Sequence, residues 1–157
     1  MRGADGRFTS RMALDGTYEP SPWAWVADQV ALYESSGGTE GTLLNDVACI
    51  VLWTRGRRSG TVRKSPLMRV TDGAGRYAIV ASMGGAPKHP VWYLNATADP
   101  HVSLQDGADL RDYTAREVTG DEKAQWWERA AAVWPAYNEY QAKTDRAIPV
   151  VVLEPVT

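Results

Sequence analysis

Continuous apolar runs separated by turn-forming residues divide most of the chain into short strands. The clearest run, residues 47–53, is bounded by Asp46 and Arg55, a pattern typical of a buried strand. Pro66 lies inside the next run and indicates an edge strand or a bulge, because proline cannot donate to a sheet ladder. Asp-Gly pairs between later runs predict tight turns. The predicted strands cover residues 47–53, 62–70, 75–82, 101–105, 110–118 and 148–153.

Helical spacing of apolar residues begins after residue 20. Ser21 and Pro22 predict a helix start, with the serine as cap and the proline at the first helical position. Gly37 and Gly38 predict its end. Further helices are predicted from Pro90 to Ala98, from a Thr119 and Glu122 capping box to Pro135, and in a short segment that carries Tyr137 and Tyr140.

The order of these elements predicts a mainly β protein with helices, in the α+β class. Hairpins join most strands, and strands do not alternate regularly with helices, which disfavours a doubly wound sheet. We therefore expect a small antiparallel barrel of about six strands, closed or partly closed. Residues 1–20 contain few large apolar groups and are predicted to be a flexible arm. Residues 21–157 are predicted to form a single domain.

Composition is that of a soluble globular protein of 157 residues, with 44% hydrophobic and 23% charged residues. The chain has no apolar run of membrane-spanning length and no signal-peptide pattern, so we expect a cytoplasmic protein. Cys49 is the only cysteine and lies in an apolar run, which indicates a buried thiol. With His89 and His101 as the only histidines, we expect no metal site.

Charge is distributed unevenly along the chain. The net charge is −2, but residues 47–98 hold eight basic residues and one acid, whereas both flanking segments are acidic. A positive middle between negative flanks suggests a localised anionic ligand, although a solvated basic strand edge would give the same pattern. The pI of about 5.7 argues against nucleic acid as the partner.

Three segments carry candidate chemistry. The loop Arg57-Arg58-Ser59-Gly60, with Arg63 beyond it, has the guanidinium groups and backbone N–H groups that chelate a phosphate. The turn Ser82-Met83-Gly84-Gly85 links a strand to the helix start at Pro90, which makes an anion-binding corner or an ordinary tight turn. The third feature is a set of aromatic residues that could line a pocket, although packing in the core would also explain them: Trp92, Trp134, Tyr137 and Tyr140.

These segments occur in an order that resembles the deazaflavin-dependent nitroreductase family, the small F420-dependent quinone reductases and nitroreductases of actinobacteria. The resemblance runs from about residue 44 to residue 155. It is carried by Gly-Arg-Arg-Ser-Gly, by Ala-Ser-x-Gly-Gly-Ala-Pro-x-His-Pro-x-Trp-Tyr-x-Asn, by Tyr-x-x-Tyr-Gln and by Ile-Pro-Val-x-x-Leu-Glu-Pro. It implies a split β-barrel of the kind that holds flavins.

The resemblance also implies which residues form the site. Ser82, Tyr137 and Tyr140 would be catalytic, facing the acceptor. The acceptor pocket would comprise Met68, Trp92, Trp134, Tyr137 and Tyr140. The cofactor would contact Thr54, Arg57, Arg58, Ser59, Gly60, Arg63, Pro66, Leu67, Val80, Ala81, Ser82, Met83, Gly84, Gly85, Val91, Trp92, Asn95 and Tyr137. Met83 departs from the lysine common in the family, and Arg55 is a candidate to restore that charge.

The implied reaction is hydride transfer from C5 of reduced F420 to a quinone, an enone or a nitroaromatic compound. Two alternatives remain open: an oxidoreductase that binds FMN in a related barrel, and a non-catalytic binder of F420. The protein would be a monomer or a homodimer. Because quinones dissolve in membranes, peripheral contact with the inner face of the cell membrane through Trp23 and Trp25 is also considered.

Overall fold

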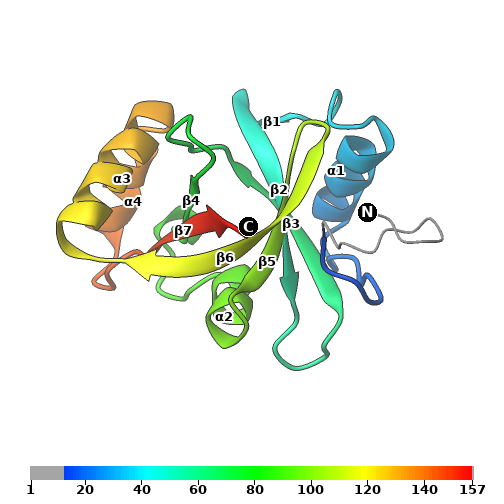
Figure 1. The fold of residues 1–157 in the computed structure, drawn as a ribbon. Coiled ribbons are helices and arrows are strands. Elements are labelled where there is room, and N and C mark those ends of the chain that lie inside the picture. Colours follow the sequence, from blue (N-terminus) through cyan, green and yellow to red (C-terminus); the bar gives the residue numbers. More distant parts are fainter. Residues whose placement is uncertain (1–12, 157) are drawn as a thin grey trace.

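The computed structural model describes residues 13–156, which fold into an antiparallel sheet of seven strands with four α-helices around it (Figure 1). In chain order the elements are α1 (Ala24–Ser35), β1 (Leu43–Leu44), β2 (Val47–Arg55), β3 (Val62–Met68), β4 (Tyr77–Val80), a 3-10 turn η1 (Met83–Gly85), α2 (Val91–Ala98), β5 (His101–Asp106), β6 (Asp109–Val118), α3 (Gly120–Val133), α4 (Ala136–Lys143) and β7 (Val150–Pro155). The α+β class is as predicted. The β2–β3 and β5–β6 hairpins also form as predicted, whereas β3 and β4, consecutive in the chain, do not pair as strands.

The sheet curls into a barrel that is split between β3 and β4. Pairing runs from β3 through β2, β5, β6 and β7 to β4, so β3 and β4 are the two ends of the path. They meet only where the chain turns between them: the Ala78 N–H donates to the Val70 carbonyl at 2.9 Å, and Thr71 bridges Tyr77. Pro66 lies on β3, whose strand pairing is with β2, so the predicted edge position is confirmed.

Alternating side chains of each strand divide the apolar residues between the barrel interior and its outer faces. On β2, Ile50 and Leu52 belong to the interior core, whereas Cys49 and Val51 pack under Val30 of α1. On β4 and β7 the same alternation sends every second residue outward against α3 and α4. The outward cluster comprises Ala78, Val80, Val150 and Val152 with Val118, Trp126, Ala130 and Tyr137.

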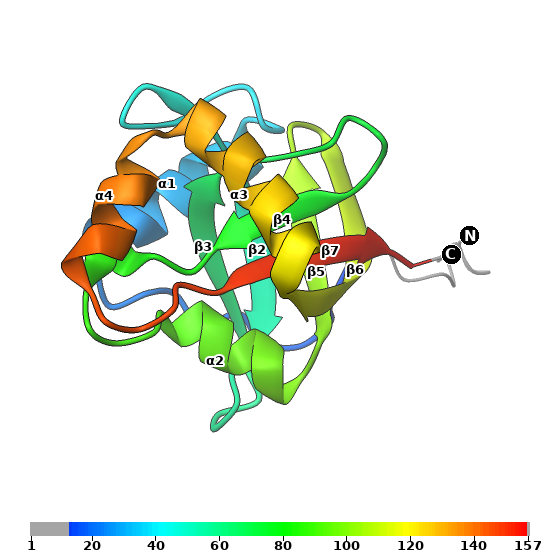
Figure 2. The same cartoon turned by 90° about the vertical axis from the view of Figure 1, so that its left-hand side faces the viewer.

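The helices cover different sides of this barrel. Figure 1 shows α1 on the opposite side from α3 and α4, and Figure 2 shows α2 across one end. Trp92 and Ala96 of α2 pack into the interior core, so α2 closes that end. No helix within residues 13–156 is long and apolar enough to cross a membrane.

Several local predictions need correction. A two-residue strand that was not predicted, β1, pairs with β2. The two strands are joined by a turn in which Asn45 and Asp46 both have positive φ. Helix α1 begins at Ala24, two residues after Pro22, although the Ser21 hydroxyl still accepts a hydrogen bond from the Trp23 N–H. Thr119 is the cap residue of α3, but its side chain makes no capping hydrogen bond.

The segment before α1 is packed rather than loose, as far as it is described. Val62 of β3 accepts a backbone hydrogen bond from Glu19 and donates one to Thr17. Leu14 is buried, and its N–H donates to the Ser103 hydroxyl at 2.8 Å. The expectation of a flexible arm is therefore wrong for residues 13–20, and residues 1–12 lie outside the described residues.

Candidate active site

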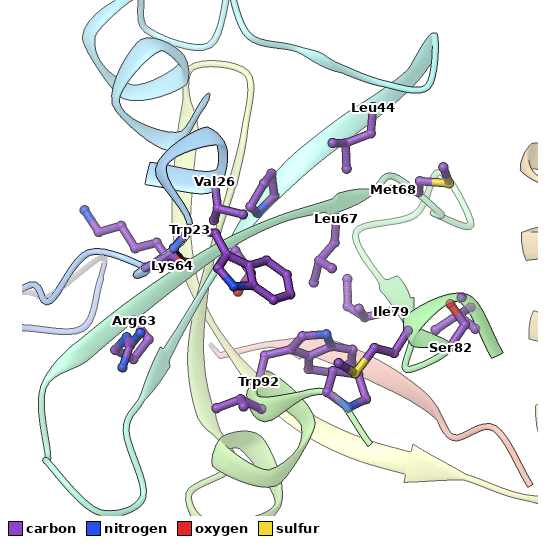
Figure 3. A pocket seen from close by; sticks show the side chains of 18 of the residues that line it. Trp23, Val26, Leu44, Arg63, Lys64, Leu67, Met68, Ile79, Ser82 and Trp92 are labelled. Carbon is purple, nitrogen blue, oxygen red and sulfur yellow. Dashed lines mark hydrogen bonds between the residues drawn. The ribbon is translucent and has the colours of Figure 1, made fainter. Parts of the chain in front are cut away.

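A groove of about 690 Å³ opens beside the split in the barrel. One wall is β3, and another is β4 with the turn that follows it. Helix α2, the start of α1, and α4 with Trp134 before it provide most of the remaining lining. In Figure 3, Arg63 lies toward one end and Ser82 and Met68 toward the other, with Trp23, Leu67 and Trp92 between them. The groove is thus a mainly apolar slot with a cation at one end and a hydroxyl at the other.

The turn after β4 adopts an unusual left-handed backbone. Met83, Gly84 and Gly85 have φ values of 47°, 65° and 83°. For Met83 this conformation costs about 1–2 kcal/mol, because its Cβ crowds the following carbonyl. The N–H groups of Gly85 and Ala86 close the turn on the Ser82 and Met83 carbonyls, and those of Met83 and Gly84 take no part in these bonds. Successive N–H groups in such a turn form a concave site for an anion.

The basic loop between β2 and β3 lies at the cationic end but outside the lining of the groove. Arg57, Arg58, Ser59 and Gly60 are all exposed, and none of them lines it. Within residues 13–156 the side chains of Arg57 and Arg58 form no ion pair, which leaves both guanidinium groups available to an anion that extends past the groove.

Two other arginines differ in how freely they can bind a ligand. Arg63 lines the groove and has a loose ion pair with Glu19 at 3.8 Å. Arg55 is occupied instead: it donates to the Gly60 and Asp15 carbonyls at 3.1 and 3.0 Å. Arg55 therefore holds the loop in place. It does not line the groove, so its position does not match that of the lysine missing at position 83.

Asn95 ties α2 to the basic loop. Its side-chain oxygen accepts a hydrogen bond from the Arg57 N–H at 3.1 Å, and its amide donates to the Thr54 hydroxyl at 3.3 Å. Asn95 is only 2% exposed and Thr54 only 1%, so water cannot readily replace these bonds. Asn95 thus fixes the loop against the groove, in addition to lining it.

We expect Asn95→Ala to lower the free energy of unfolding by roughly 1–3 kcal/mol, because the buried Thr54 hydroxyl and the Arg57 N–H lose their partner. It should also weaken binding of an anionic ligand by releasing the loop. Urea unfolding and ligand titration measure the two effects. Thr97→Ala, on an exposed site of the same helix, is the control and should change stability by less than about 0.5 kcal/mol. Equal effects of both variants would contradict this role.

Three hydroxyl groups gather at the other end of the groove. Ser82 and Tyr137 both line it, and neither hydroxyl has a hydrogen-bond partner among the described residues. The Tyr140 hydroxyl accepts a hydrogen bond from the Trp134 indole at 3.2 Å, which leaves its own proton free to donate. Burial raises the pKa of Tyr137 above its ordinary value, and nearby Tyr140 adds to the effect. Tyr137 therefore stays neutral and acts as a hydrogen-bond donor at physiological pH.

We predict that Tyr137→Phe lowers kcat/KM about tenfold while leaving ligand affinity near that of the wild type, since one hydrogen bond to developing charge is lost. Because the pKa of Tyr137 is raised, its ionisation should produce no inflection in the rate below about pH 10. Steady-state kinetics across pH measure both. Tyr113→Phe, in the interior core and away from the groove, is the matched control. A tenfold loss in both variants would show that the effect is not specific to the groove.

The structure brings most of the predicted site residues to the groove. Those that line it are Thr54, Arg63, Pro66, Leu67, Met68, Val80, Ser82, Met83, Gly84, Val91, Trp92, Asn95, Trp134, Tyr137 and Tyr140. Two others are directed elsewhere: Ala81 packs in the interior core, and Gly85 lies against the Tyr140 backbone. Neither lines the groove: Ala81 is fully buried in the interior core, and α4 covers Gly85.

The site residues that sequence reasoning missed come mainly from α1 and its approach. Trp23 and Trp25 are 60% and 56% exposed and line the groove together with Pro22 and Val26. Their distance from the basic loop in sequence conceals this. The available signal was a pair of tryptophans at a helix start, which also fits core packing.

A barrel split beside a groove of this kind defines a split-barrel protein of the flavin-reductase type. The family described as F420H(2)-dependent quinone reductase matches residues 25–155. The chain belongs to this family, as the motifs predicted.

Relatives agree with this assignment. An F420H(2)-dependent quinone reductase of Mycobacterium tuberculosis is 33% identical over 132 residues, which is 78% of this chain and 85% of the relative. A solved F420-H2 dependent reductase, FDR-A, is 51% identical with a TM-score of 0.64, covering 68% of this chain and 93% of its own. Another structure, described as a domain-swapped dimer, is 47% identical with a TM-score of 0.67, covering 85% and 100%.

Proposed function

We propose that this protein is an oxidoreductase that uses reduced F420 to reduce a quinone. The observation that carries the proposal is the polarity of the groove. Arg63 lies toward one end, and toward the other lie the hydroxyls of Ser82 and Tyr137, which have no hydrogen-bond partner within residues 13–156. Such a slot can hold an anionic cofactor and a flat acceptor in contact with each other.

The residues present fit F420. A volume of about 690 Å³ is in the range of cofactor sites, which span roughly 300–1,000 Å³. Arg63 would meet the anionic part of the cofactor, and Arg57 and Arg58 its extension beyond the groove. Leu67, Ile79 and Trp92 give an apolar surface for a planar ring. When bound, reduced F420 supplies a hydride.

The chain itself contributes orientation and hydrogen bonds. The apolar walls hold the acceptor flat and exclude water, which strengthens polar contacts made there. The hydroxyls of Ser82, Tyr137 and Tyr140 would donate to the acceptor oxygen as negative charge develops. Burial raises the pKa of Tyr137 and makes its hydroxyl a weaker acid, so solvent is the better proton source.

Enones and nitroaromatic compounds are proposed as further acceptors. Both present an oxygen that the same hydroxyls can bind. Met68 and Trp134 also line the groove, so they are expected to set the preference among acceptors.

We further propose a cytoplasmic homodimer that contacts the inner face of the cell membrane. The dimer rests on the related structure described as domain-swapped. Membrane contact rests on Trp23, Trp25 and Val91, which are exposed apolar residues at the groove. Indole rings at such a mouth suit a headgroup region and would place the groove where membrane quinones dissolve.

Cofactor binding tests the proposal against an FMN enzyme. The purified protein should be colourless. It should quench the fluorescence of added F420 and should retain the bound F420 through dialysis. Yellow protein that retains FMN through dialysis would support the alternative and contradict the proposal. A non-catalytic binder would retain F420 without accelerating its oxidation by a quinone.

A further inference from the structure

Arg146 lies after α4 and reaches across to the left-handed turn that follows β4. Its Nε donates to the Ala86 carbonyl at 2.8 Å. Its Nη1 donates to the Ala81 carbonyl at 3.1 Å, and its Nη2 to the Ser82 carbonyl at 2.7 Å. One guanidinium group thus binds the backbone on both sides of the turn.

The remaining contact of Arg146 is with His89, whose Nδ1 lies 3.2 Å from Nη1. A guanidinium group only donates, so Nδ1 is the acceptor and the ring carries its proton on Nε2. No carboxylate within residues 13–156 pairs with Arg146, and desolvation lowers its pKa. Burying half of a guanidinium group without a carboxylate partner costs free energy unless its N–H groups are hydrogen-bonded. Here the carbonyl groups of the turn accept those hydrogen bonds.

The backbone of Arg146 is held in turn by α4. Gln141 donates from its side-chain amide to the Arg146 carbonyl at 2.8 Å and accepts the Ile148 N–H at 2.9 Å. Helix α4 also carries Tyr137 and Tyr140. Arg146 is therefore a connection between the helix that provides the tyrosine hydroxyls and the turn that provides Ser82.

We propose that Arg146 is a positioning residue: by holding the carbonyls of Ala81, Ser82 and Ala86, it sets the distance between the Ser82 side and the tyrosine side of the groove. This inference rests on the proposed function for its catalytic consequence. A lysine could not replace the arginine fully, because a single ammonium group lacks the planar fork that reaches several carbonyls at once.

Arg146→Met keeps much of the apolar stem and removes every donor. In the free protein, amide hydrogen exchange at Gly85 and Ala86 should speed up at least tenfold, whereas exchange in β2 stays unchanged. With cofactor and menadione, kcat should fall about tenfold and the Kd for F420 should rise severalfold. Arg146→Lys should recover part of kcat. A merely structural role would lower the melting temperature without this loss of kcat.

Arg116→Met is the matched control, because Arg116 also makes several charged hydrogen bonds but lies outside the groove lining. It should change neither exchange in the turn nor kcat. Unchanged exchange in Arg146→Met would overturn the inference, as would faster exchange with unchanged kcat and Kd. Exchange is measured without cofactor, so a wild type that fails to bind F420 would refute the proposed function separately.

Discussion

Arg63→Ala should raise the Kd for F420 about 10–100-fold with little change in kcat at saturating cofactor. Arg63 lines the groove on β3, and its ion pair with Glu19 is loose at 3.8 Å. Its guanidinium is therefore available to an anionic ligand, and a charged hydrogen bond contributes roughly 1.5–3 kcal/mol. Fluorescence titration of F420 measures the change.

The position of the arginine should decide the size of this effect. Arg58 is exposed on the loop outside the groove, so Arg58→Ala should weaken binding less and mainly at low salt. Arg111→Ala, an exposed arginine on β6 and away from the groove, should leave the Kd unchanged. An unchanged Kd in Arg63→Ala would mean that the anionic part of the cofactor binds elsewhere.

Gly85→Ala should destabilise the fold by about 2–4 kcal/mol, which corresponds to a fall in melting temperature of roughly 5–15 °C. Gly85 has φ +83°, and an added Cβ would lie 2.8 Å from the Tyr140 carbonyl oxygen. That atom is backbone, so the turn and α4 would have to separate. Because the two sides of the groove are formed there, kcat should fall as well.

Gly84→Ala is the matched control one residue earlier. Gly84 also has positive φ, at +65°, but an added Cβ would meet no atom within 4 Å. It should therefore cost only the left-handed strain of about 1–2 kcal/mol. Thermal unfolding of both variants compares a clash with strain alone, and equal losses would show that the contact with Tyr140 is unimportant.

The fold could be predicted largely because its strands are local patterns. The apolar run of β2 and the alternation along the later strands require no long-range information, and Pro66 correctly indicated an edge. The packed segment at residues 13–20 was missed because its order comes from pairing with Val62 and Ser103, far away in sequence.

In the candidate site too, local motifs could be predicted from the sequence, whereas contacts between distant segments could not. Resemblance to the family located the loop and the turn, and most of the residues that it indicated line the groove. It could not show that Ala81 faces inward, that Arg55 is already paired, or that Trp23 reaches the groove. These depend on register and on helix placement. The role of Arg146 could not be predicted for the same reason, since its contacts lie about 60 residues away in sequence.

The proposal that the protein is a quinone reductase is tested most directly by the rate at which menadione oxidises reduced F420 in the presence of the wild-type protein. The recovery of F420 absorbance measures this rate. We expect saturable acceleration over buffer with the wild type, and a much smaller acceleration with Arg63→Ala when the cofactor concentration is below saturation. A protein that binds F420 but gives no acceleration with menadione, other quinones or enones would contradict the proposal and identify a non-catalytic binder.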